Sequence, residues 1–310
     1  MTGEPADDTL PRAAGVSGRD RLGDVPAGGR TVGDGGTVQR LDAEAVAARI
    51  ADITGVRLVV EGPCPGGEVG AAYVCWPDGR RSVLSEGNAR VAPLLDRARA
   101  AGVPTARQEL TAHVDGRRVI VQQRLPGTPP ATVDAALVRQ LIDVNTRLAG
   151  LLSSAPSGPR PVDLHLSGDG PGFCLHQPLA GYGGRAARLL DHVHEVGAAL
   201  PHITGDDLVH FDFHPRNVLV AGGRITGVVD WDGAARYDGT FDLVTLRFTL
   251  AREQPRLVAM VDEVLRGRDP ARLRAYWAHM SLRQVDWSIR HHDSSTVEAW
   301  LDVTETHSLR

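Results

Sequence analysis

The sequence predicts an α+β protein with two lobes, a small five-stranded antiparallel lobe followed by a larger, mainly helical lobe. Between residues 56 and 123, short runs rich in β-branched residues alternate with turns containing Gly, Pro or Asp, which is typical of antiparallel strands. From residue 133 onward, apolar residues recur at helical spacing over several long segments. A polar loop with a short hairpin, at residues 208–232, interrupts these helices.

The composition limits the classes of function. Of the 310 residues, 42% are hydrophobic, enough for a sizeable core, and the net charge of −4 argues against binding to nucleic acid. No apolar run approaches the ~18 residues of a membrane helix, and no apolar signal core begins the chain. We therefore expect a cytoplasmic protein without a membrane span. The three cysteines show no metal-binding spacing, and the chain contains no lysine, so no ammonium side chain is present to bind a phosphate.

The first lobe is predicted to span residues 39–124, after a tail at residues 1–38 that has no apolar period and is predicted to be disordered. Asp42 can cap a first helix that ends at Gly55. The other elements follow in chain order: strands at 56–60, 71–76 and 81–85, a helix at 89–101, and strands at 107–113 and 118–123. The loop Gly62–Gly70 between the first two strands is rich in glycine, so its backbone N–H groups can approach a phosphate closely.

The second lobe is predicted to span residues 125–310 and begins with a turn-rich link at 126–130. Its helices are predicted at residues 133–152, 185–200, 239–251, 255–266 and 270–291, with a last one from Asp293 or Ser294 to about residue 306. A loop rich in Pro, Ser and Gly separates the first two of these helices.

The polar loop carries the chemistry. It reads HFDFHPRN from His210 to Asn217, and two β-rich runs follow with Gly222-Gly223 between them, a strong hairpin signal. Asn217 lies at the entrance of this hairpin and Asp230 at its exit, so their side chains can converge, with Asp212 on the loop just before. A carboxylate base beside an Asn/Asp pair that can hold Mg²⁺ is what phosphoryl transfer from a nucleotide needs. The alternative is a surface loop whose polar residues only form turns.

The spacing His210-x-Asp212-x-x-x-x-Asn217, followed by Val-Asp-Trp-Asp at residues 229–232, resembles the catalytic loop and metal aspartate of the protein-kinase-like superfamily. The form Asp-x-His-Pro-x-Asn looks like its aminoglycoside phosphotransferase family. This resemblance implies a bilobal protein-kinase-like fold, with ATP or GTP and Mg²⁺ as cofactors. It makes Asp212 the catalytic base, Asn217 and Asp230 the metal ligands, and His210 and Asp242 the structural supports of the site.

The same resemblance implies an O-phosphotransferase that acts on a hydroxyl of a small molecule, such as an aminoglycoside antibiotic. A kinase for a metabolite such as choline, homoserine or a sugar is an alternative, and so is a catalytically inactive pseudokinase. The sequence does not decide between ATP and GTP, and it does not indicate the oligomeric state.

The nucleotide would lie under the glycine-rich loop. The residues that the resemblance assigns to it are Gly66, Gly67 and Gly70 in that loop, Ser85 at the end of the third strand, and Gln123, Arg124 and Leu125 at the hinge between lobes. The family usually has a lysine where Ser85 stands, and a neutral hydroxyl cannot replace that charge. Arg81 and Arg90 are candidates for the missing cation, and Ser85 is the feature that favours the pseudokinase.

The acceptor site is predicted from the last helices, which carry Asp286, Trp287 and Asp293. An acidic pocket with aromatic residues would suit a polycationic or amino-sugar acceptor. The alternative is that these residues are charges on the outer surface of helices.

Overall fold

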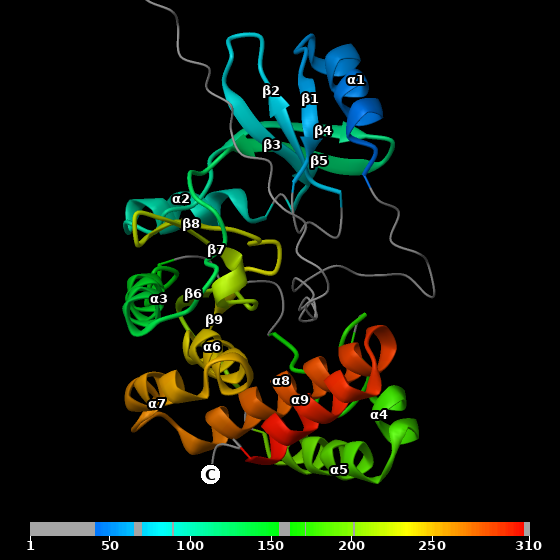
Figure 1. Cartoon of the computed structure of the whole chain (residues 1–310), viewed down its shortest axis with the longest axis vertical. Coiled ribbons are helices and arrows are strands. Elements are labelled where there is room, and N and C mark those ends of the chain that lie inside the picture. Colours follow the sequence, from blue (N-terminus) through cyan, green and yellow to red (C-terminus); the bar gives the residue numbers. More distant parts are fainter. Residues whose placement is uncertain are drawn as a thin grey trace, which may run out of the picture.

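The computed structural model of this chain describes residues 41–64, 70–88, 90–154, 162–170, 172–200 and 202–306. A five-stranded antiparallel sheet lies at one end of the molecule and most helices lie at the other, with the polar loop and its hairpin between them (Figure 1). This confirms the predicted fold class. The predicted tail at residues 1–38 lies outside the described residues, and the predicted domain boundaries stay predictions.

The sheet of the first lobe has the strand order β1-β2-β3-β5-β4. Its strands are β1 Val59–Pro63, β2 Ala72–Cys75, β3 Arg81–Glu86, β4 Gln108–Val114 and β5 Arg117–Gln123. All neighbouring strands are antiparallel, and short turns join β2 to β3 and β4 to β5. The prediction of five strands in this region is confirmed, with bounds shifted by one to three residues.

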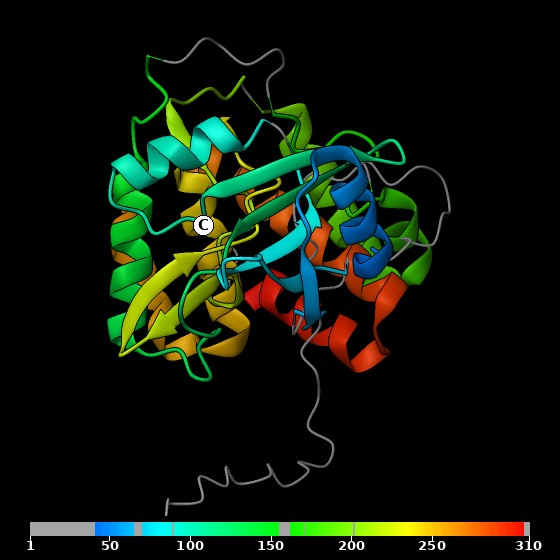
Figure 2. The ribbon, with the colours of Figure 1, turned by 90° about the horizontal axis from the view of Figure 1, so that it is seen from above.

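Helix α1 Ala43–Thr54 covers one face of this sheet, as the view from above shows (Figure 2). Asp42 caps the helix by accepting a hydrogen bond from the Ala45 N–H group at 3.1 Å, and Gly55 ends it with a left-handed φ of 75°. The apolar side of α1 and the facing strand residues form a small core that includes Ile50, Val74 and Leu84. Side chains alternate along strands, so Ser85, next to Leu84, lies on the opposite face of the sheet.

The second lobe contains more helices than the sequence predicts. They are α3 Ala135–Leu148, α4 His176–Tyr182, α5 Gly184–Ala198, α6 Thr240–Glu253, α7 Val258–Leu265, α8 Pro270–His291 and α9 Ser294–Thr306, with short 3₁₀ turns at Pro215–Asn217 and Pro255–Leu257. Helix α4 lies inside the segment predicted to be a loop. Within the described residues, no helix combines the length and the apolar character needed to cross a membrane.

Two small sheets connect the loop to the lobes. Strand β6 Asp207–Val209 pairs with β9 Ala235–Tyr237, and β7 Val218–Ala221 pairs with β8 Arg224–Val228. Gly222 and Gly223 have φ angles of 57° and 73° and form the two-residue turn of the second pair, which confirms the predicted hairpin.

The main core surrounds helix α6, whose residues from Thr240 to Ala251 are all buried. A helix that is buried on every side can be held only by neighbours on all sides, here α3, α7, α8 and α9. Helix α2 Ala92–Ala100, which precedes the hinge in the chain, also adds Leu95 and Ala98 to this larger core. The two lobes therefore share apolar packing through α2.

Candidate active site

Residues His210–Asn217 form a loop that helix α6 holds from one side. Both oxygens of the Asp242 carboxylate accept backbone N–H groups, from His210 at 2.8 Å and from Phe211 at 2.9 Å. Phe211 has a left-handed φ of 67°, which is uncommon for a residue with a side chain. Burial raises the pKa of Asp242 to about 7, against the lowering effect of the two N–H groups. Asp242 thus lies where the sequence analysis expects a support of the loop.

His210 joins the loop to the hairpin. Its Nε2 atom lies 2.8 Å from the Val229 carbonyl oxygen, and its Nδ1 atom accepts the Asp212 N–H group at 3.3 Å. A carbonyl can only accept, so the ring proton is on Nε2. Burial lowers the pKa of His210 to about 4, and the ring is therefore neutral near pH 7. These bonds suit a structural role.

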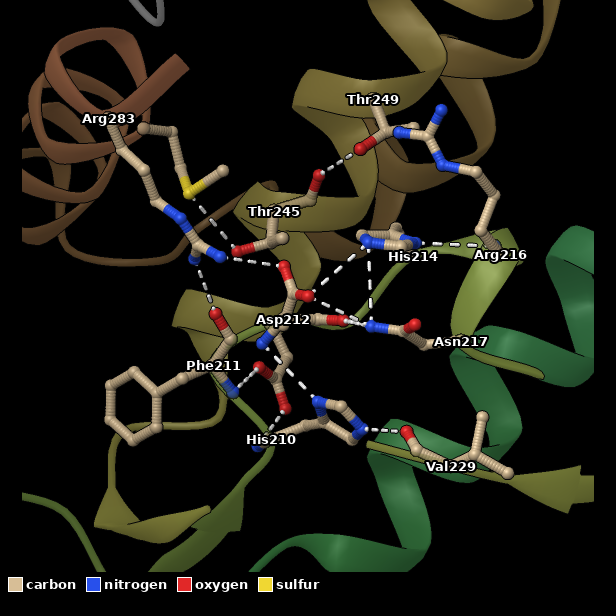
Figure 3. Close-up of polar contacts among 12 residues, drawn as sticks. His210, Phe211, Asp212, His214, Arg216, Asn217, Val229, Thr245, Thr249 and Arg283 are labelled. Carbon is tan, nitrogen blue, oxygen red and sulfur yellow. Dashed lines mark hydrogen bonds and ion pairs between the residues drawn. The ribbon is translucent and has the colours of Figure 1, made fainter. Parts of the chain in front are cut away.

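Asp212 lies at the centre of a polar cluster and is 1% exposed (Figure 3). Its Oδ1 atom accepts a bond of 2.9 Å from Nη2 of Arg283 on α8, and its Oδ2 atom accepts one of 2.9 Å from Nδ2 of Asn217. The Nε2 atom of His214 lies 3.5 Å from the same Oδ2 atom. Burial raises the pKa of Asp212, but the nearby His214 and Arg283 outweigh it and hold that pKa below its usual value. The carboxylate is therefore ionised at neutral pH.

Asn217 and Asp230 come together as the hairpin predicts. The Val229 N–H group donates to the Asn217 carbonyl oxygen at 2.9 Å, so Asp230 is the next residue after a direct partner of Asn217. The Asn217 Nδ2 group donates to the carbonyl and the carboxylate of Asp212, both at 2.9 Å. Its amide oxygen then faces away from Asp212, and an amide oxygen plus an exposed carboxylate is a donor set that Mg²⁺ accepts.

A metal at this place would depend on ligands from outside the protein as well. Among the described residues, no three side chains of His, Cys, Asp or Glu gather into a metal-binding group. Mg²⁺ usually keeps several waters and takes phosphate oxygens of a substrate together with one or two carboxylates. The pair Asn217 and Asp230 fits that pattern.

The nucleotide side is described only in part. Gly66 and Gly67 lie outside the described residues, and Gly70 has a left-handed φ of 89°. Ser85 is half-buried on β3 and pairs with Ile120 of β5. Three residues after it, Asn88 donates to the Asp232 carbonyl oxygen at 3.2 Å, so the end of β3 lies beside the hairpin exit. The contact places the segment that follows β3, and with it Asn88, beside Asp232.

The two arginines suggested as replacements for the lysine have different surroundings. Arg81 donates to Glu61 at 2.9 Å on the sheet, which engages its charge. Arg90 is exposed, and its backbone N–H group bonds the Asn88 side chain at 3.0 Å.

The hinge residues contact both lobes. The Gln123 N–H group donates to the Arg107 carbonyl oxygen at 2.8 Å, and the guanidinium of Arg124 lies 4.1 Å from the ring centre of Tyr73 on β2. The Leu125 side chain lies against Gly227 of β8, where an added Cβ atom would meet it at 2.9 Å. Gln123 and Arg124 therefore contact the first lobe, and Leu125 contacts the hairpin β7–β8.

The three predicted acceptor residues are engaged in helix packing. Asp286 is 0% exposed and accepts bonds from Arg290 at 2.7 Å and from the Leu175 N–H group at 3.0 Å. Asp293 accepts the Thr296 N–H group at 2.9 Å at the start of α9, and the Trp287 ring packs against the His291 ring with 3.8 Å between centres and a tilt of 35°. An acceptor role for these residues stays a prediction, and for Asp286 it would require a bound molecule to reach a side chain that is 0% exposed.

A polar stripe on α8 was not predicted. Five residues follow one another at spacings of three and four and bond segments of the second lobe: Tyr276, His279, Arg283, Asp286 and Arg290. Tyr276 donates to Asp238 at 2.9 Å, His279 lies 2.8 Å from the Leu164 carbonyl, and Arg290 donates to the Gly172 carbonyl at 2.6 Å. The periodicity is visible in the sequence, but polar residues at helical spacing usually indicate a solvated face.

Comparisons with known proteins agree with the geometry of the site. The sequence profile of the phosphotransferase enzyme family matches residues 77–276. No curated protein sequence matches the chain.

Several solved structures share the fold. A ternary complex of a thermostable mutant of aminoglycoside phosphotransferase APH(4)-Ia with ADP and hygromycin B has a TM-score of 0.60 at 19% identity, covering 84% of this chain and 97% of that one. The amicoumacin kinase hAmiN has a TM-score of 0.54 at 14% identity, with coverages of 87% and 95%. The choline kinase LicA from Streptococcus pneumoniae has a TM-score of 0.57 at 10% identity, with coverages of 85% and 99%.

These identities show a common fold and leave the acceptor open. The family match spans well over half of the chain and includes the whole loop and hairpin that carry Asp212, Asn217 and Asp230. This chain therefore belongs to the phosphotransferase enzyme family.

Proposed function

We propose that this enzyme transfers the γ-phosphoryl group of a nucleoside triphosphate to a hydroxyl group of a small molecule, with an antibiotic of the aminoglycoside type as the first candidate acceptor. The observation that supports this most directly is the arrangement around Asp212. One ionised carboxylate lies between Asn217, which leaves its amide oxygen to a metal, and the buried Arg283.

The chemistry divides among few residues. The bond between the γ-phosphorus and its bridging oxygen breaks, and a bond forms to the acceptor oxygen, whose proton passes to the Asp212 carboxylate. Asp212 also orients that hydroxyl, because a carboxylate that accepts fixed bonds keeps one rotamer. Asn217 and Asp230 would hold Mg²⁺, which supplies positive charge to the phosphates.

The acceptor class rests on the relatives. Hygromycin B, amicoumacin and choline occur in the names of solved structures with this fold. An antibiotic and a metabolite such as choline are both compatible with a shared fold at these identities. Nucleotide identity is equally open, since ADP and AMP-PNP occur with the relatives and GTP is the remaining alternative.

The test is phosphate transfer by the purified protein. ATP or GTP is supplied with Mg²⁺ and a panel that includes hygromycin B, other aminoglycosides and choline, and mass spectrometry detects an added phosphoryl group. We expect transfer to at least one acceptor, and we expect Asp212→Asn to lower kcat by about 10²–10⁴ while nucleotide binding persists. Asp230→Ala should abolish the Mg²⁺-dependent turnover without unfolding the protein.

A pseudokinase gives the opposite result. It would bind nucleotide and transfer nothing to any acceptor, and Ser85 in place of a lysine is the observation that favours it. Transfer that survives Asp212→Asn unchanged would instead refute the assigned base.

A further inference from the structure

The two oxygens of the Asp212 carboxylate have different numbers of donors beside them. An ionised carboxylate oxygen has two directions from which it can accept a hydrogen bond. Asn217 Nδ2 takes one direction of Oδ2, at 2.9 Å, and the His214 Nε2 group lies 3.5 Å from the same atom. The described residues offer Oδ1 a single donor, Arg283 Nη2 at 2.9 Å. One accepting direction of Oδ1 therefore has no donor among the described residues.

The proton of His214 supports this count. Its Nδ1 atom accepts the Arg216 N–H group at 3.2 Å, so a neutral His214 ring carries its proton on Nε2, the atom nearer Asp212. Both neighbours of Oδ2 are thus donors. A hydroxyl that gives its proton to Asp212 meets less competition at Oδ1.

Resting on the function proposed above, we propose that Arg283 is a positioning residue for phosphoryl transfer, which holds Asp212 so that Oδ1 receives the acceptor's hydroxyl. The group that Arg283 acts through is the carboxylate, and Arg283 itself touches neither phosphate nor acceptor in this scheme. The function above needs Asp212 as base, and the present inference adds which oxygen reacts and what fixes it.

The fork of the guanidinium explains how the position is fixed. Nη2 binds the Asp212 side chain and Nη1 donates to the Phe211 carbonyl oxygen at 2.9 Å. One rigid planar group therefore ties the carboxylate to the backbone one residue before it, so the side chain cannot rotate independently of the loop. Asp242 holds the N–H groups of the same loop from α6, on the other side. Figure 3 shows the Arg283 side chain beside Phe211 and Asp212 of the loop.

Burial makes the arrangement rigid as well as specific. Arg283 and Asp212 are each 1% exposed, so water does not screen or replace their bond. A lysine would keep the charge but not the fork, because an ammonium on a flexible stem cannot span the carbonyl and the carboxylate in one plane. Arg283→Lys therefore separates charge from positioning.

The experiment compares transfer by the wild type, Arg283→Lys, Asp212→Asn and the double variant, with an acceptor found for the wild type. We expect Arg283→Lys to lower kcat by about 10²-fold through misplacement of the base, with the KM for nucleotide within about twofold of wild type. In the Asp212→Asn background the same change should have no further effect on kcat, because the carboxylate through which it acts is gone.

The matched control is Arg247→Lys. Arg247 is also a largely buried arginine, 7% exposed, and it forms an ion pair with Asp262 on α7. We expect it to lower the unfolding midpoint without the loss of kcat. A loss of kcat in Arg283→Lys that is equally large in the Asp212→Asn background would show a merely structural role and overturn the inference.

Further outcomes also support or refute the role of Arg283. If Arg283→Lys lacks cooperative unfolding, transfer by Arg283→Ala is measured with and without millimolar guanidinium ion. Recovery of kcat supports the inference, and the absence of recovery overturns it. A wild type that transfers phosphate to no acceptor refutes the proposed function and this inference together, whereas wild-type transfer with an unaffected Arg283→Lys refutes the inference alone.

Discussion

The buried His279 should make the stability of this protein sensitive to acid. Its Nδ1 atom lies 2.8 Å from the Leu164 carbonyl oxygen, its ring packs against Phe241, and the positive Arg283 lies one turn further along α8. Burial lowers the pKa of His279 to about 4, from an ordinary value of 6.5. Between these two pH values the His279 ring binds a proton in the unfolded chain but stays neutral in the folded protein. Stability is therefore fully present above pH 6.5 and falls as the pH falls toward 4.

The magnitude follows from the size of the shift. Each pH unit in that window removes about 1.4 kcal/mol of unfolding free energy per such group, so going from pH 6.5 to 4.5 removes about 2 kcal/mol through His279. His210, whose pKa is also lowered to about 4, acts in the same direction. Asp242, whose pKa is raised to about 7, acts in the opposite direction. Only a comparison of a His279 variant with the wild type isolates the contribution of His279.

His279→Asn is the informative variant, because an amide N–H group can take the place of Nδ1–H toward Leu164 and cannot titrate. Urea unfolding followed by tryptophan fluorescence at pH 7.5 and pH 4.5 gives the free energy at each pH. We expect the variant to be destabilised at pH 7.5 by lost packing, and this deficit to shrink by about 2 kcal/mol at pH 4.5. The control is His192→Asn at an exposed site of α5, which should show no such change. A deficit for His279→Asn that is equal at both pH values would refute the reasoning.

Three further predictions concern the nucleotide, the core and a turn. Ser85→Arg should tighten ATP binding several-fold in calorimetry, because a charge-assisted bond replaces a neutral one, and unchanged affinity would mean that another arginine already binds the phosphates. Leu141→Ala, at a 0% exposed site of α3, should lower the unfolding free energy by about 3 kcal/mol in denaturant titration, and a loss below about 1 kcal/mol would contradict its packing. Gly127 has a φ of 100°, and an added Cβ atom would lie 2.7 Å from Thr226 Oγ1, whereas Gly79 has a φ of 83° and open space around it. Gly127→Ala should therefore lower the unfolding midpoint more than Gly79→Ala does. Equal shifts would show that the contact with Thr226 relaxes.

Local signals in the sequence were sufficient for the long elements and the hairpin. Helix α8 begins at Pro270 and ends at His291 as predicted, because Asp269 caps it and accepts the Ala271 N–H group at 2.8 Å. The turn at Gly222-Gly223 forms because glycine adopts left-handed φ without strain.

Short elements escaped prediction for equally physical reasons. Helix α4 has seven residues, which include Pro178 and Gly181, and Gly183 ends it, so its own sequence favours a loop. Strands β6 and β9 have three residues each and lie far apart in the chain, and only the tertiary structure pairs them.

The site was predicted where its parts are close in sequence and missed where they are not. Asp212, Asn217 and Asp230 lie on one loop and hairpin, so turn chemistry alone brings them near one another. Arg283 is 71 residues from its partner Asp212, and an arginine on a long helix normally extends into solvent. The burial of Asp286 was unexpected for the same reason, since an acidic residue near the end of a helix is rarely 0% exposed, and its acceptor role stays a prediction.

The spacing of the polar stripe on α8 also constrains how the length of this chain can change in evolution. An α-helix turns by about 100° and advances by about 1.5 Å for each residue. A substitution in the stripe removes the bonds of one residue, whereas the deletion of any single residue between Tyr276 and His279 would turn His279, Arg283 and Arg290 away from their partners at once. Relatives of different length should therefore carry their insertions and deletions outside residues 276–290, even where the residues of this segment themselves differ.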